Sequence, residues 1–300
     1  MVKQEVNTIP IYVGIDGGGT KCKLIMENAH GERIAQAKAG PANICLSVET
    51  AVTSIRQAMQ EALQQAGFDE KPKALKLYVG FGLAGTEIPS ACHHFLKLIS
   101  HDFTDMRLKS DAYTACLGAH AGQDGAIVIV GTGTVGYKII AGKERRMSGW
   151  GFPHSNEGSG GLIGLELIRQ TFYAYDKRQK WTPLLDAVYQ KFNYQIDQLV
   201  TFANYANATK YASLFPLFTD YLAKEDPSAL SMIKEAALKI DDIISQLLQG
   251  DTQLPLCLFG GVSTFIEPYL SDVSQRRLVP RQFDATDGAL MLIKKECCHD

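Results

Sequence analysis

Several features that would narrow the function are missing from this 300-residue sequence. It carries 30 basic and 32 acidic residues, and its formal net charge of −2 creates no strong field toward nucleic acid or an anionic membrane. No apolar run approaches the roughly 20 residues that cross a bilayer. The opening residues MVKQEVNTIP lack the apolar stretch of a signal peptide. We therefore expect a cytoplasmic protein that binds neither nucleic acid nor a membrane.

The cysteines show none of the spacings that metal sites and disulfide frameworks need. There are seven of them, an odd number, and no C-x-x-C pair occurs. The seven histidines are also scattered, and the adjacent His93 and His94 would not face each other on a helix. We expect buried thiols in a reducing compartment and no metal site made of these residues. The cysteines are Cys22, Cys45, Cys92, Cys116, Cys257, Cys297 and Cys298.

Three consecutive glycines lie between two strand-like stretches in residues 11–31, IYVGIDGGGTKCKLIMENAHG. Every second residue from 11 to 15 is a β-branched aliphatic, and extended character resumes after Thr20. Because glycine loses much conformational freedom on folding, a triplet indicates a positive φ or a close backbone approach. The pattern predicts a hairpin whose tip offers bare N–H groups, a hydroxyl and the Asp16 carboxylate, which suits a phosphate with Mg²⁺. On these residues alone, an ordinary glycine-rich hairpin is an equal alternative.

Strands and helices alternate over the next hundred residues. Residues 47–67 place apolar side chains at three- and four-residue steps and end at Gly67, which is typical of an amphipathic helix with a C-terminal glycine. The sequence then predicts a strand at 75–79, a helix near 87–99, a short strand at 106–109 and a helix at 111–120. Such alternation favours an α/β domain with helices on a mixed sheet.

The opening pattern of strand, glycine/threonine turn and strand returns in residues 124–144, DGAIVIVGTGTVGYKIIAGKE. With 46% hydrophobic residues the chain is long enough for two cores. We therefore expect two related domains, 1–111 and 112–300, with the option that the last helix returns to the first. Helical patterns follow at 158–176, 184–192, 196–206 and 228–248, and a late strand at 254–259 ends in GGVS.

Two other nucleotide-binding motifs do not explain these glycines. GTGTVG at 131–136 satisfies G-x-G-x-x-G, but a dinucleotide-binding turn opens a helix, whereas the strand-like YKIIA follows here. The Walker pattern G-x-x-x-x-G-K-[ST] is absent from the sequence. Two glycine/threonine turns remain, with a third glycine pair at 260–261.

Taken together, these motifs resemble those of the acetate and sugar kinase/Hsc70/actin superfamily. Within it, the chain is similar to the N-acetylglucosamine kinases and short bacterial glucosamine kinases, a branch of the BadF/BadG/BcrA/BcrD-type ATPases. GIDGGGTKC resembles the first phosphate motif, IVGTGT the second and LFGGVS the adenosine motif. SDAYTACLGAH at 110–120 and GWGFPHSNEGSGGLIGLELI at 149–168 also look like family blocks. The resemblance runs in the expected order from residue 11 to 290.

The resemblance implies a two-lobed α/β fold of the actin-like ATPase, or ribonuclease H-like, type. Duplicated βββαβα lobes would surround a nucleotide cleft that binds ATP, and Asp16 would orient Mg²⁺. Asp111 matches the family's general base, although a helix N-cap is the plain structural alternative. The residues implied for nucleotide binding are Gly17, Gly18, Gly19, Thr20, Gly131, Thr132, Gly133, Thr134, Gly260, Gly261 and Ser263.

The resemblance also implies a sugar site. Asn43 taken alone would be a turn residue after Pro41, and Trp150 taken alone would be a core or interface aromatic. Many relatives carry Asp where this chain has Asn156, which removes a charge near the expected sugar hydroxyls. The implied sugar contacts are Asn43, Gly149, Trp150, Gly151, Asn156 and Glu157.

The expected function is therefore ATP-dependent phosphorylation of the C6 hydroxyl of an amino sugar. Glucosamine is favoured over N-acetylglucosamine, and the resemblance implies a homodimer. One alternative resembles the ATPase activators of 2-hydroxyacyl-CoA dehydratases, whose interfacial iron–sulfur cluster would need thiolates such as that of Cys116. Another is a sugar sensor that keeps the fold without catalysis, although a sensor would not need Asp111.

Overall fold

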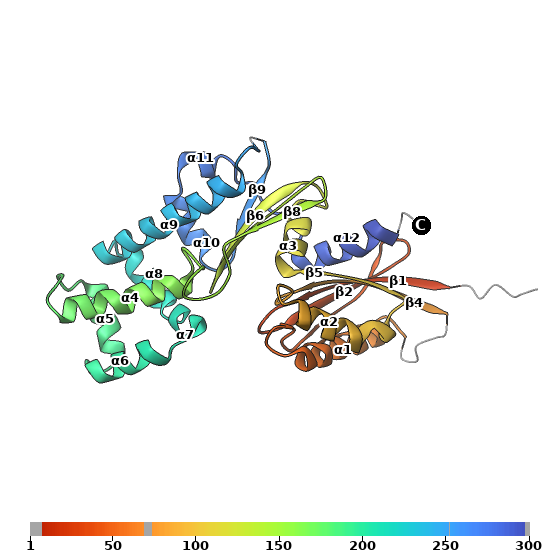
Figure 1. Cartoon of the computed structure of the whole chain (residues 1–300), viewed down its shortest axis with the longest axis horizontal. Coiled ribbons are helices and arrows are strands. Elements are labelled where there is room, and N and C mark those ends of the chain that lie inside the picture. The colour runs from red at the N-terminus through yellow and green to blue at the C-terminus, as the bar shows by residue number, and fades with distance from the viewer. Residues whose placement is uncertain (1–7, 69–73, 252, 298–300) are drawn as a thin grey trace, which may run out of the picture. The chain divides into compact units, whose positions relative to one another are not determined.

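The structure, a computed structural model, describes residues 8–68, 74–251 and 253–297 and the side chains up to residue 295. The chain forms two compact units (Figure 1). Unit 1 combines residues 1–125, 139–144 and 280–300, and unit 2 combines 126–138 and 145–279. The last helix, α12 (Ala285–Cys297), therefore belongs to the same unit as the first strand.

Unit 1 is built on a five-stranded mixed sheet of order β3-β2-β1-β4-β5. β1 pairs antiparallel with β2 and parallel with β4, β2 pairs antiparallel with β3, and β4 pairs parallel with β5. The strands are β1 (Ile9–Gly17), β2 (Cys22–Asn28), β3 (Arg33–Ala39), β4 (Leu75–Leu83) and β5 (Asp105–Ser110). The helices are α1 (Val48–Gln65), α2 (Pro89–Ile99), α3 (Asp111–Ala119) and α12, with a 3-10 turn at Ser100–Asp102.

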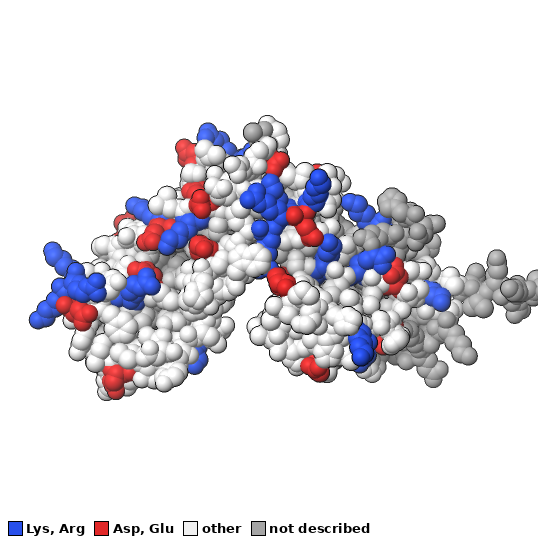
Figure 2. All heavy atoms as spheres, in the orientation of Figure 1, with Lys and Arg blue, Asp and Glu red and all other residues white. Residues whose placement is uncertain are grey.

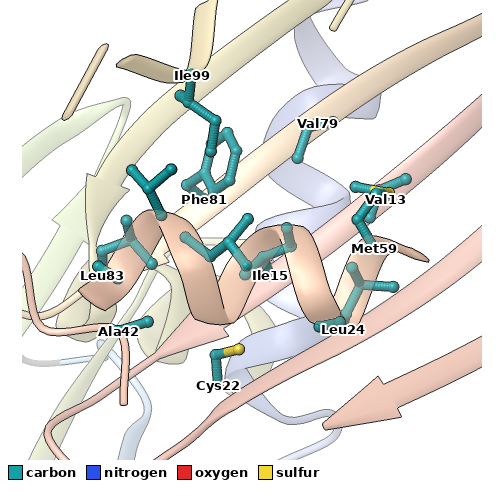
Figure 3. Close-up of a cluster of buried hydrophobic side chains, with 14 of the residues drawn as sticks. Val13, Ile15, Cys22, Leu24, Ala42, Met59, Val79, Phe81, Leu83 and Ile99 are labelled. Carbon is teal, nitrogen blue, oxygen red and sulfur yellow. The ribbon is translucent and has the colours of Figure 1, made fainter. Parts of the chain in front are cut away.

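One face of this sheet carries the hydrophobic core of unit 1. Alternate residues of β1 and β4, among them Ile15 and Phe81, are fully buried and pack with Met59 from α1 and Ile99 from α2 (Figure 3). The aromatic ring of Phe95 meets that of Phe81 edge to face at 5.4 Å. The period-two alternation in the sequence therefore marks the side chains that α1 and α2 cover.

The opposite face of the sheet is covered by α3 and α12, which lie side by side in Figure 1. α12 approaches the sheet so closely that glycine is needed beneath it. A Cβ on Gly14 would lie 2.3 Å from the carbonyl oxygen of Thr286, and one on Gly80 would lie 1.9 Å from that of Ala289. Any side chain at these two positions would therefore displace the last helix from the sheet.

Unit 2 contains most of a second three-stranded meander, of which residues 139–144 fall in unit 1, and continues into helices. Its sheet has the order β8-β7-β6-β9, and β9 runs parallel to β6. The strands are β6 (Gly125–Val130), β7 (Thr134–Ile140), β8 (Lys143–Met147) and β9 (Leu256–Phe259). The helices are α4 (Gly160–Tyr175), α5 (Pro183–Lys191), α6 (Ile196–Tyr205), α7 (Ala208–Ala212), α8 (Phe215–Leu222), α9 (Pro227–Leu247), α10 (Ser263–Ile266) and α11 (Asp272–Gln275), with a 3-10 turn at Glu267–Tyr269.

Most of the expected helices and strands are present, but the expectation of buried thiols is wrong for two cysteines. The first glycine turn joins two antiparallel strands, and a strand rather than a helix follows GTGTVG. Cys22, Cys116 and Cys257 are buried, but Cys45 is exposed and Cys92 is partly exposed, contrary to the expectation for those two thiols. The side chains of Cys297 and Cys298 lie outside the described residues.

Lys and Arg side chains alternate with Asp and Glu over the face shown in Figure 2. Across the part of the chain that the structure describes, no helix combines the length and the apolar character needed to cross a membrane.

Candidate active site

The first glycine turn, residues 17–20 between β1 and β2, is held by backbone hydrogen bonds from two neighbouring segments. Two of its carbonyl groups accept hydrogen bonds from the N–H groups of Ala42 and Ala84, at 2.9 and 2.8 Å. Among the described residues, no acceptor is hydrogen-bonded to the N–H groups from Gly19 to Lys21, and these three residues are exposed. The turn therefore presents consecutive free N–H groups, which is the arrangement that binds phosphate oxygens.

The three glycines of the first turn differ in the space around them. A Cβ on Gly17 would lie 2.6 Å from Leu83 Cδ2 and 2.8 Å from Ala42 Cβ, so this position is closed by packing. A Cβ on Gly18 would meet its first neighbour at 3.9 Å, and one on Gly19 would meet nothing within 4 Å. None of the three has a positive φ. Of the two sequence-based explanations, left-handed backbone is wrong and close approach applies to Gly17. For Gly18 and Gly19, close approach of a ligand stays a prediction.

Asp16, the residue before this turn, lies among charged groups of unit 1. The pKa of its carboxyl is raised to about 6, first by burial and then by the negative charges of Asp111 and Asp284, against the opposing effect of Lys23 and Lys21. A carboxylate that is costly to ionise in the free protein gains from a nearby cation. This environment therefore fits a divalent metal ion that arrives with a ligand.

A metal ion at Asp16 would need most of its ligands from elsewhere. Within the described residues, no group of three or more His, Cys, Asp or Glu side chains is placed to hold a metal. Mg²⁺ usually keeps several waters and binds through one or two carboxylates together with substrate phosphates. One carboxylate beside a turn with free N–H groups fits this mode, whereas a metal bound by the protein alone does not.

Asp111 lies where β5 ends and α3 begins. The N-cap of α3 is Ser110, whose Oγ accepts the N–H of Tyr113 at 3.1 Å, so the N-cap alternative for Asp111 is wrong by one residue. Asp111 is the first residue of the helix, and its Oδ1 accepts the N–H of Ala112 at 2.8 Å. The N-terminus of a helix favours a negative charge at this position.

Asn43 lies in the loop between β3 and α1, and its amide oxygen closes a turn. It accepts the N–H groups of Cys45 at 2.9 Å and Leu46 at 3.2 Å. The turn packs on Gly85, where φ is +93° and a Cβ would lie 2.7 Å from the Asn43 Oδ1 atom. The structural role expected of Asn43 is therefore present, and it leaves the amide nitrogen as a donor.

The second glycine turn, residues 131–134 between β6 and β7, is also held by its neighbours. The first N–H groups of α4, from Gly160 and Gly161, donate to two carbonyls of the turn at 2.8 and 3.2 Å. The N–H of Thr134 donates to the amide oxygen of Asn156 at 3.2 Å. Within the described residues this leaves the N–H groups of 132–133 without an acceptor. This turn thus also offers free backbone N–H groups, as the first turn does.

A buried hydroxyl and a third glycine pair complete the second turn. Thr134 is 2% exposed, and its Oγ1 has no hydrogen-bond partner among the described residues. Gly260, with φ +116°, packs so tightly on the end of β6 that a Cβ would lie 2.3 Å from the carbonyl oxygen of Val130. The Oγ of Ser263 donates to the carbonyl of Gly260 at 2.7 Å. The second phosphate motif and the adenosine motif therefore meet at one end of the unit 2 sheet.

The loop at 148–157 carries the remaining expected sugar contacts. Gly149 and Gly151 have φ values of +76° and +126°, and Trp150 between them is 69% exposed. The guanidinium of Arg146 lies 4.7 Å from the centre of the Trp150 ring. Glu157 accepts a hydrogen bond from the Ser148 hydroxyl. An exposed indole supported from one side leaves its other face for a flat ligand, which argues against the core interpretation of Trp150.

The structure thus gathers the expected residues into one set in each unit. Unit 1 holds Asp16, the first turn, Asn43 and Asp111, and unit 2 holds the second turn, the third glycine pair and the 148–157 loop. Asp284 and Lys23 were missed by the sequence analysis although both influence Asp16. For Lys23, the hairpin register opposite Asp16 was an available signal.

Known proteins resemble this chain over nearly its whole length. Over 95% of its length and 96% of the relative's, the chain is 39% identical to the glucosamine kinase GspK of Vibrio cholerae. It is 26% identical to an N-acetylmuramic acid/N-acetylglucosamine kinase of Clostridium acetobutylicum, over 95% of this chain and 98% of that protein.

Solved structures share the fold. A protein from Chromobacterium violaceum, described as an N-acetylglucosamine kinase, superposes with a TM-score of 0.85 at 30% identity, covering 96% of this chain and 99% of that one. A ROK family glucokinase from Streptomyces griseus gives a TM-score of 0.53 at 15% identity, covering 95% and 99%, which extends the likeness of fold to the two-lobed sugar kinases. The model of the BadF/BadG/BcrA/BcrD ATPase family matches residues 13–292, and the chain belongs to that family.

Proposed function

We propose that this protein is an amino-sugar kinase that transfers the γ-phosphoryl group of ATP to the C6 hydroxyl of glucosamine. The observation that carries the proposal is the pair of glycine/threonine turns whose free N–H groups suit phosphate, together with the partly buried carboxylate of Asp16 and the carboxylate of Asp111 at the start of α3. The glucosamine kinase relative, alike over nearly the whole chain, supports the same activity.

In the proposed reaction, the free N–H groups of the two turns bind phosphate oxygens of ATP. Asp16 would hold Mg²⁺, which would neutralise charge on the phosphates. Asp111 accepts the proton of the C6 hydroxyl while the oxygen of that hydroxyl bonds to the γ-phosphorus. The bond from that phosphorus to the oxygen bridging it to the β-phosphorus breaks, and ADP leaves with that oxygen. The protein's contribution is to position these groups and to exclude water.

The choice of glucosamine rests on the 148–157 loop and on the relatives. The exposed Trp150 ring offers a stacking surface for a pyranose, and the Glu157 carboxylate is a counter-charge for the ammonium that glucosamine carries and N-acetylglucosamine lacks. The adenosine motif at Gly260, Gly261 and Ser263 is proposed to receive the nucleoside. A homodimer remains a prediction that size-exclusion chromatography with light scattering tests.

The alternative activator of a 2-hydroxyacyl-CoA dehydratase is not favoured. Cys116, the thiol considered for an interfacial iron–sulfur cluster, is fully buried, and its Sγ contacts the carbonyl oxygen of Gly125 at 3.3 Å. A ligand shared between two subunits has to reach the surface. The kinase names of the relatives also leave the cluster hypothesis without support.

One experiment tests the proposed function. Purified protein is incubated with ATP, Mg²⁺ and one sugar from a panel of glucosamine, N-acetylglucosamine, N-acetylmannosamine, N-acetylmuramic acid and glucose. We expect ADP release with glucosamine, and ³¹P and ¹H NMR should place the phosphate on O6. If no sugar of the panel led to ADP release, the kinase proposal would be rejected. Preference for an acetylated sugar would reject the assignment to glucosamine.

A further inference from the structure

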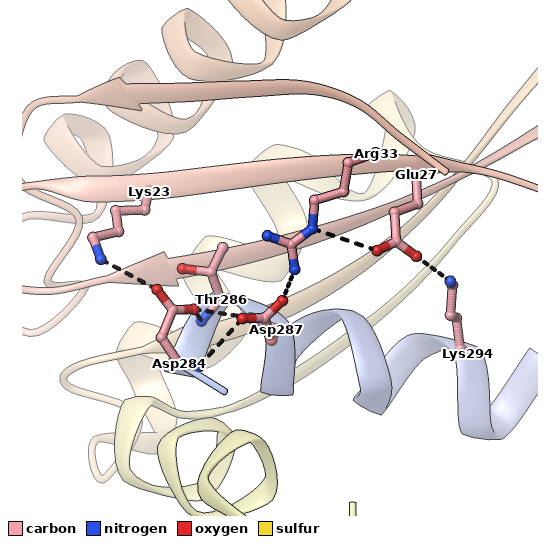
Figure 4. Close-up of polar contacts among 7 residues, drawn as sticks. All are labelled: Lys23, Glu27, Arg33, Asp284, Thr286, Asp287 and Lys294. Atoms are coloured by element: carbon pink, nitrogen blue, oxygen red, sulfur yellow. Dashed lines mark hydrogen bonds and ion pairs between the residues drawn. The ribbon is translucent and has the colours of Figure 1, made fainter. Parts of the chain in front are cut away.

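The hairpin register brings a lysine directly opposite the proposed metal-binding carboxylate. Asp16 on β1 and Lys23 on β2 are paired residues of the antiparallel ladder, so their side chains lie on the same face. Opposite charges in such a position ordinarily attract one another across the strands. Here the ammonium of Lys23 instead bonds the Oδ2 atom of Asp284 at 3.3 Å (Figure 4). Within the described residues, no ion pair joins Lys23 to Asp16.

Asp284 is held firmly in the position from which it binds Lys23. Its Oδ1 accepts the N–H groups of Thr286 at 2.9 Å and Asp287 at 3.2 Å, so it caps the start of α12. In return, the Asp284 N–H donates to Asp287 Oδ2 at 3.2 Å. Such a reciprocal cap fixes a helix N-terminus.

Further contacts fix α12 itself against the sheet. Asp287 pairs with Arg33 from β3, and Lys294 pairs with Glu27 from β2, as the dashed lines in Figure 4 show. Together with the close contact over Gly14 and Gly80, these pairs leave the Asp284 carboxylate little freedom to move.

Asp284 also keeps its charge. Burial would raise the pKa of its carboxyl, but the N–H of Asp287 and the ammonium of Lys23 outweigh burial, and the pKa is lowered. The lysine is therefore attracted to a carboxylate that stays ionised, while Asp16, in its more buried position, gains no bonded cation of its own.

We propose that Asp284 is a positioning residue that diverts Lys23 from Asp16 and so leaves the Asp16 carboxylate open to the magnesium ion of the nucleotide. This inference rests on the proposed function for its purpose, although the diversion itself is a property of the free protein. The end of the chain thereby completes a site that the first strand begins.

The variant Asp284→Asn separates this role from that of a helix cap. Asparagine is as good an N-cap as aspartate, so the start of α12 is kept while the negative charge is lost. Lys23, freed from its partner, then pairs with Asp16 and competes with the metal ion. The second variant, Lys23→Met, removes the competing ammonium and keeps the length of the apolar stem.

The first measurement uses the free protein and needs no ligand. Urea unfolding at pH 8 gives the free energy of unfolding with Asp16→Asn, with Lys23→Met, with both substitutions and with neither. These four values give the coupling free energy between the two side chains. We expect this coupling to be at least threefold larger in the Asp284→Asn background than in the wild-type background. Equal coupling in the two backgrounds would overturn the diversion.

The second measurement uses calorimetric titration of ADP at graded Mg²⁺ concentrations. For Asp284→Asn we expect the Mg²⁺ requirement to rise roughly two- to fivefold, the range of an exposed ion pair. Adding Lys23→Met to Asp284→Asn should return it toward the wild-type value. An unchanged requirement in Asp284→Asn, or a rise that Lys23→Met does not reverse, would overturn the positioning role.

The two measurements also keep this inference apart from the proposed function. If wild-type protein binds no ADP in a Mg²⁺-dependent manner, the proposed function fails, while the unfolding experiment still decides whether Asp284 diverts Lys23. If ADP and Mg²⁺ bind as proposed but the coupling is equal in both backgrounds, the proposed function stands and the diversion is wrong.

Discussion

The amide oxygen of Asn156 accepts a hydrogen bond from the backbone N–H of Thr134 at 3.2 Å, so a residue of the 148–157 loop holds the second glycine turn. Asn156 is 8% exposed and Thr134 is 2% exposed, which makes the contact part of the interior. A Cβ on Gly133 would lie 3.0 Å from the same oxygen. Any change at Asn156 therefore acts on the turn that we propose binds phosphate.

Replacing Asn156 by leucine should weaken ATP binding. The variant leaves the buried N–H of Thr134 without an acceptor, at a cost of about 1 to 3 kcal/mol. This corresponds to roughly 5- to 150-fold in the KM for ATP if the turn shifts to recover a partner. Asn156→Asp is the matched control, because a carboxylate oxygen accepts the same bond. Steady-state kinetics against ATP measure both variants, and wild-type KM values in Asn156→Leu would exclude the turn-holding role.

Replacing Asp111 by asparagine should remove the general base without disturbing the nucleotide. We expect kcat to fall by about 10² to 10⁴, the usual range for the loss of a proton acceptor, while calorimetric ADP affinity stays within about twofold. Ser110→Ala is the control, since it removes the cap of α3 and costs about 0.5 to 2 kcal/mol of stability but keeps the carboxylate. More than half of the wild-type turnover in Asp111→Asn would reject the assignment.

Adjacent glycines of the first turn should respond differently to substitution. Gly17→Ala places a methyl group against Leu83 and Ala42, and we expect it to lower the free energy of unfolding by about 1 to 3 kcal/mol. Gly18→Val has open space around its Cβ, so it should fold normally and lose ADP binding because the side chain occupies the phosphate position. Urea unfolding and calorimetry on both variants test this pair, and intact ADP affinity in Gly18→Val would show that the turn does not contact phosphate.

The local elements of this fold were predictable because their signals lie within short stretches of sequence. The α1 helix appears as apolar residues at helical spacing followed by Gly67, and in the structure Gly67 has the positive φ of +77° expected after a helix. The strand after the second turn was identifiable from YKIIA. In contrast, β3 (Arg33–Ala39) was missed, because an edge strand with alternate polar residues carries a weak apolar signal.

The parts of the site that depend on distant residues were not predictable from pattern alone. Gly14 and Gly80 have no local reason to be glycine, and only the position of α12 above them explains both. The Lys23–Asp284 pair joins residues 261 positions apart in the sequence. One sequence without an alignment contains no signal for such a pair.

The final prediction concerns the Asp16 carboxyl, whose pKa is raised from 3.8 to about 6 by burial and by the charges of Asp111 and Asp284. The unfolded chain ionises near pH 3.8, whereas the folded protein keeps the proton until about pH 6. In this window the folded state binds more protons, so the Asp16 contribution to stability is complete below pH 3.8 and is lost as pH rises to about 6.

The side chain of Asp16→Asn is neutral at every pH, so this variant should not lose stability in the same way as the pH rises. Above pH 6 we expect the variant to exceed the wild type in free energy of unfolding by on the order of 2 to 3 kcal/mol, and near pH 4 the two should converge. The same variant should lose most of its kinase activity, because the group that destabilises the free protein is the one that we propose binds the metal ion. Urea unfolding between pH 4 and 8 measures the difference, with the exposed Asp220→Asn on α8 as the control for a general change of charge. The difference in free energy of unfolding between Asp16→Asn and the wild type could instead stay constant across this range. Asp16 would then ionise freely in the folded protein, and the proposal that it binds the metal ion would be rejected.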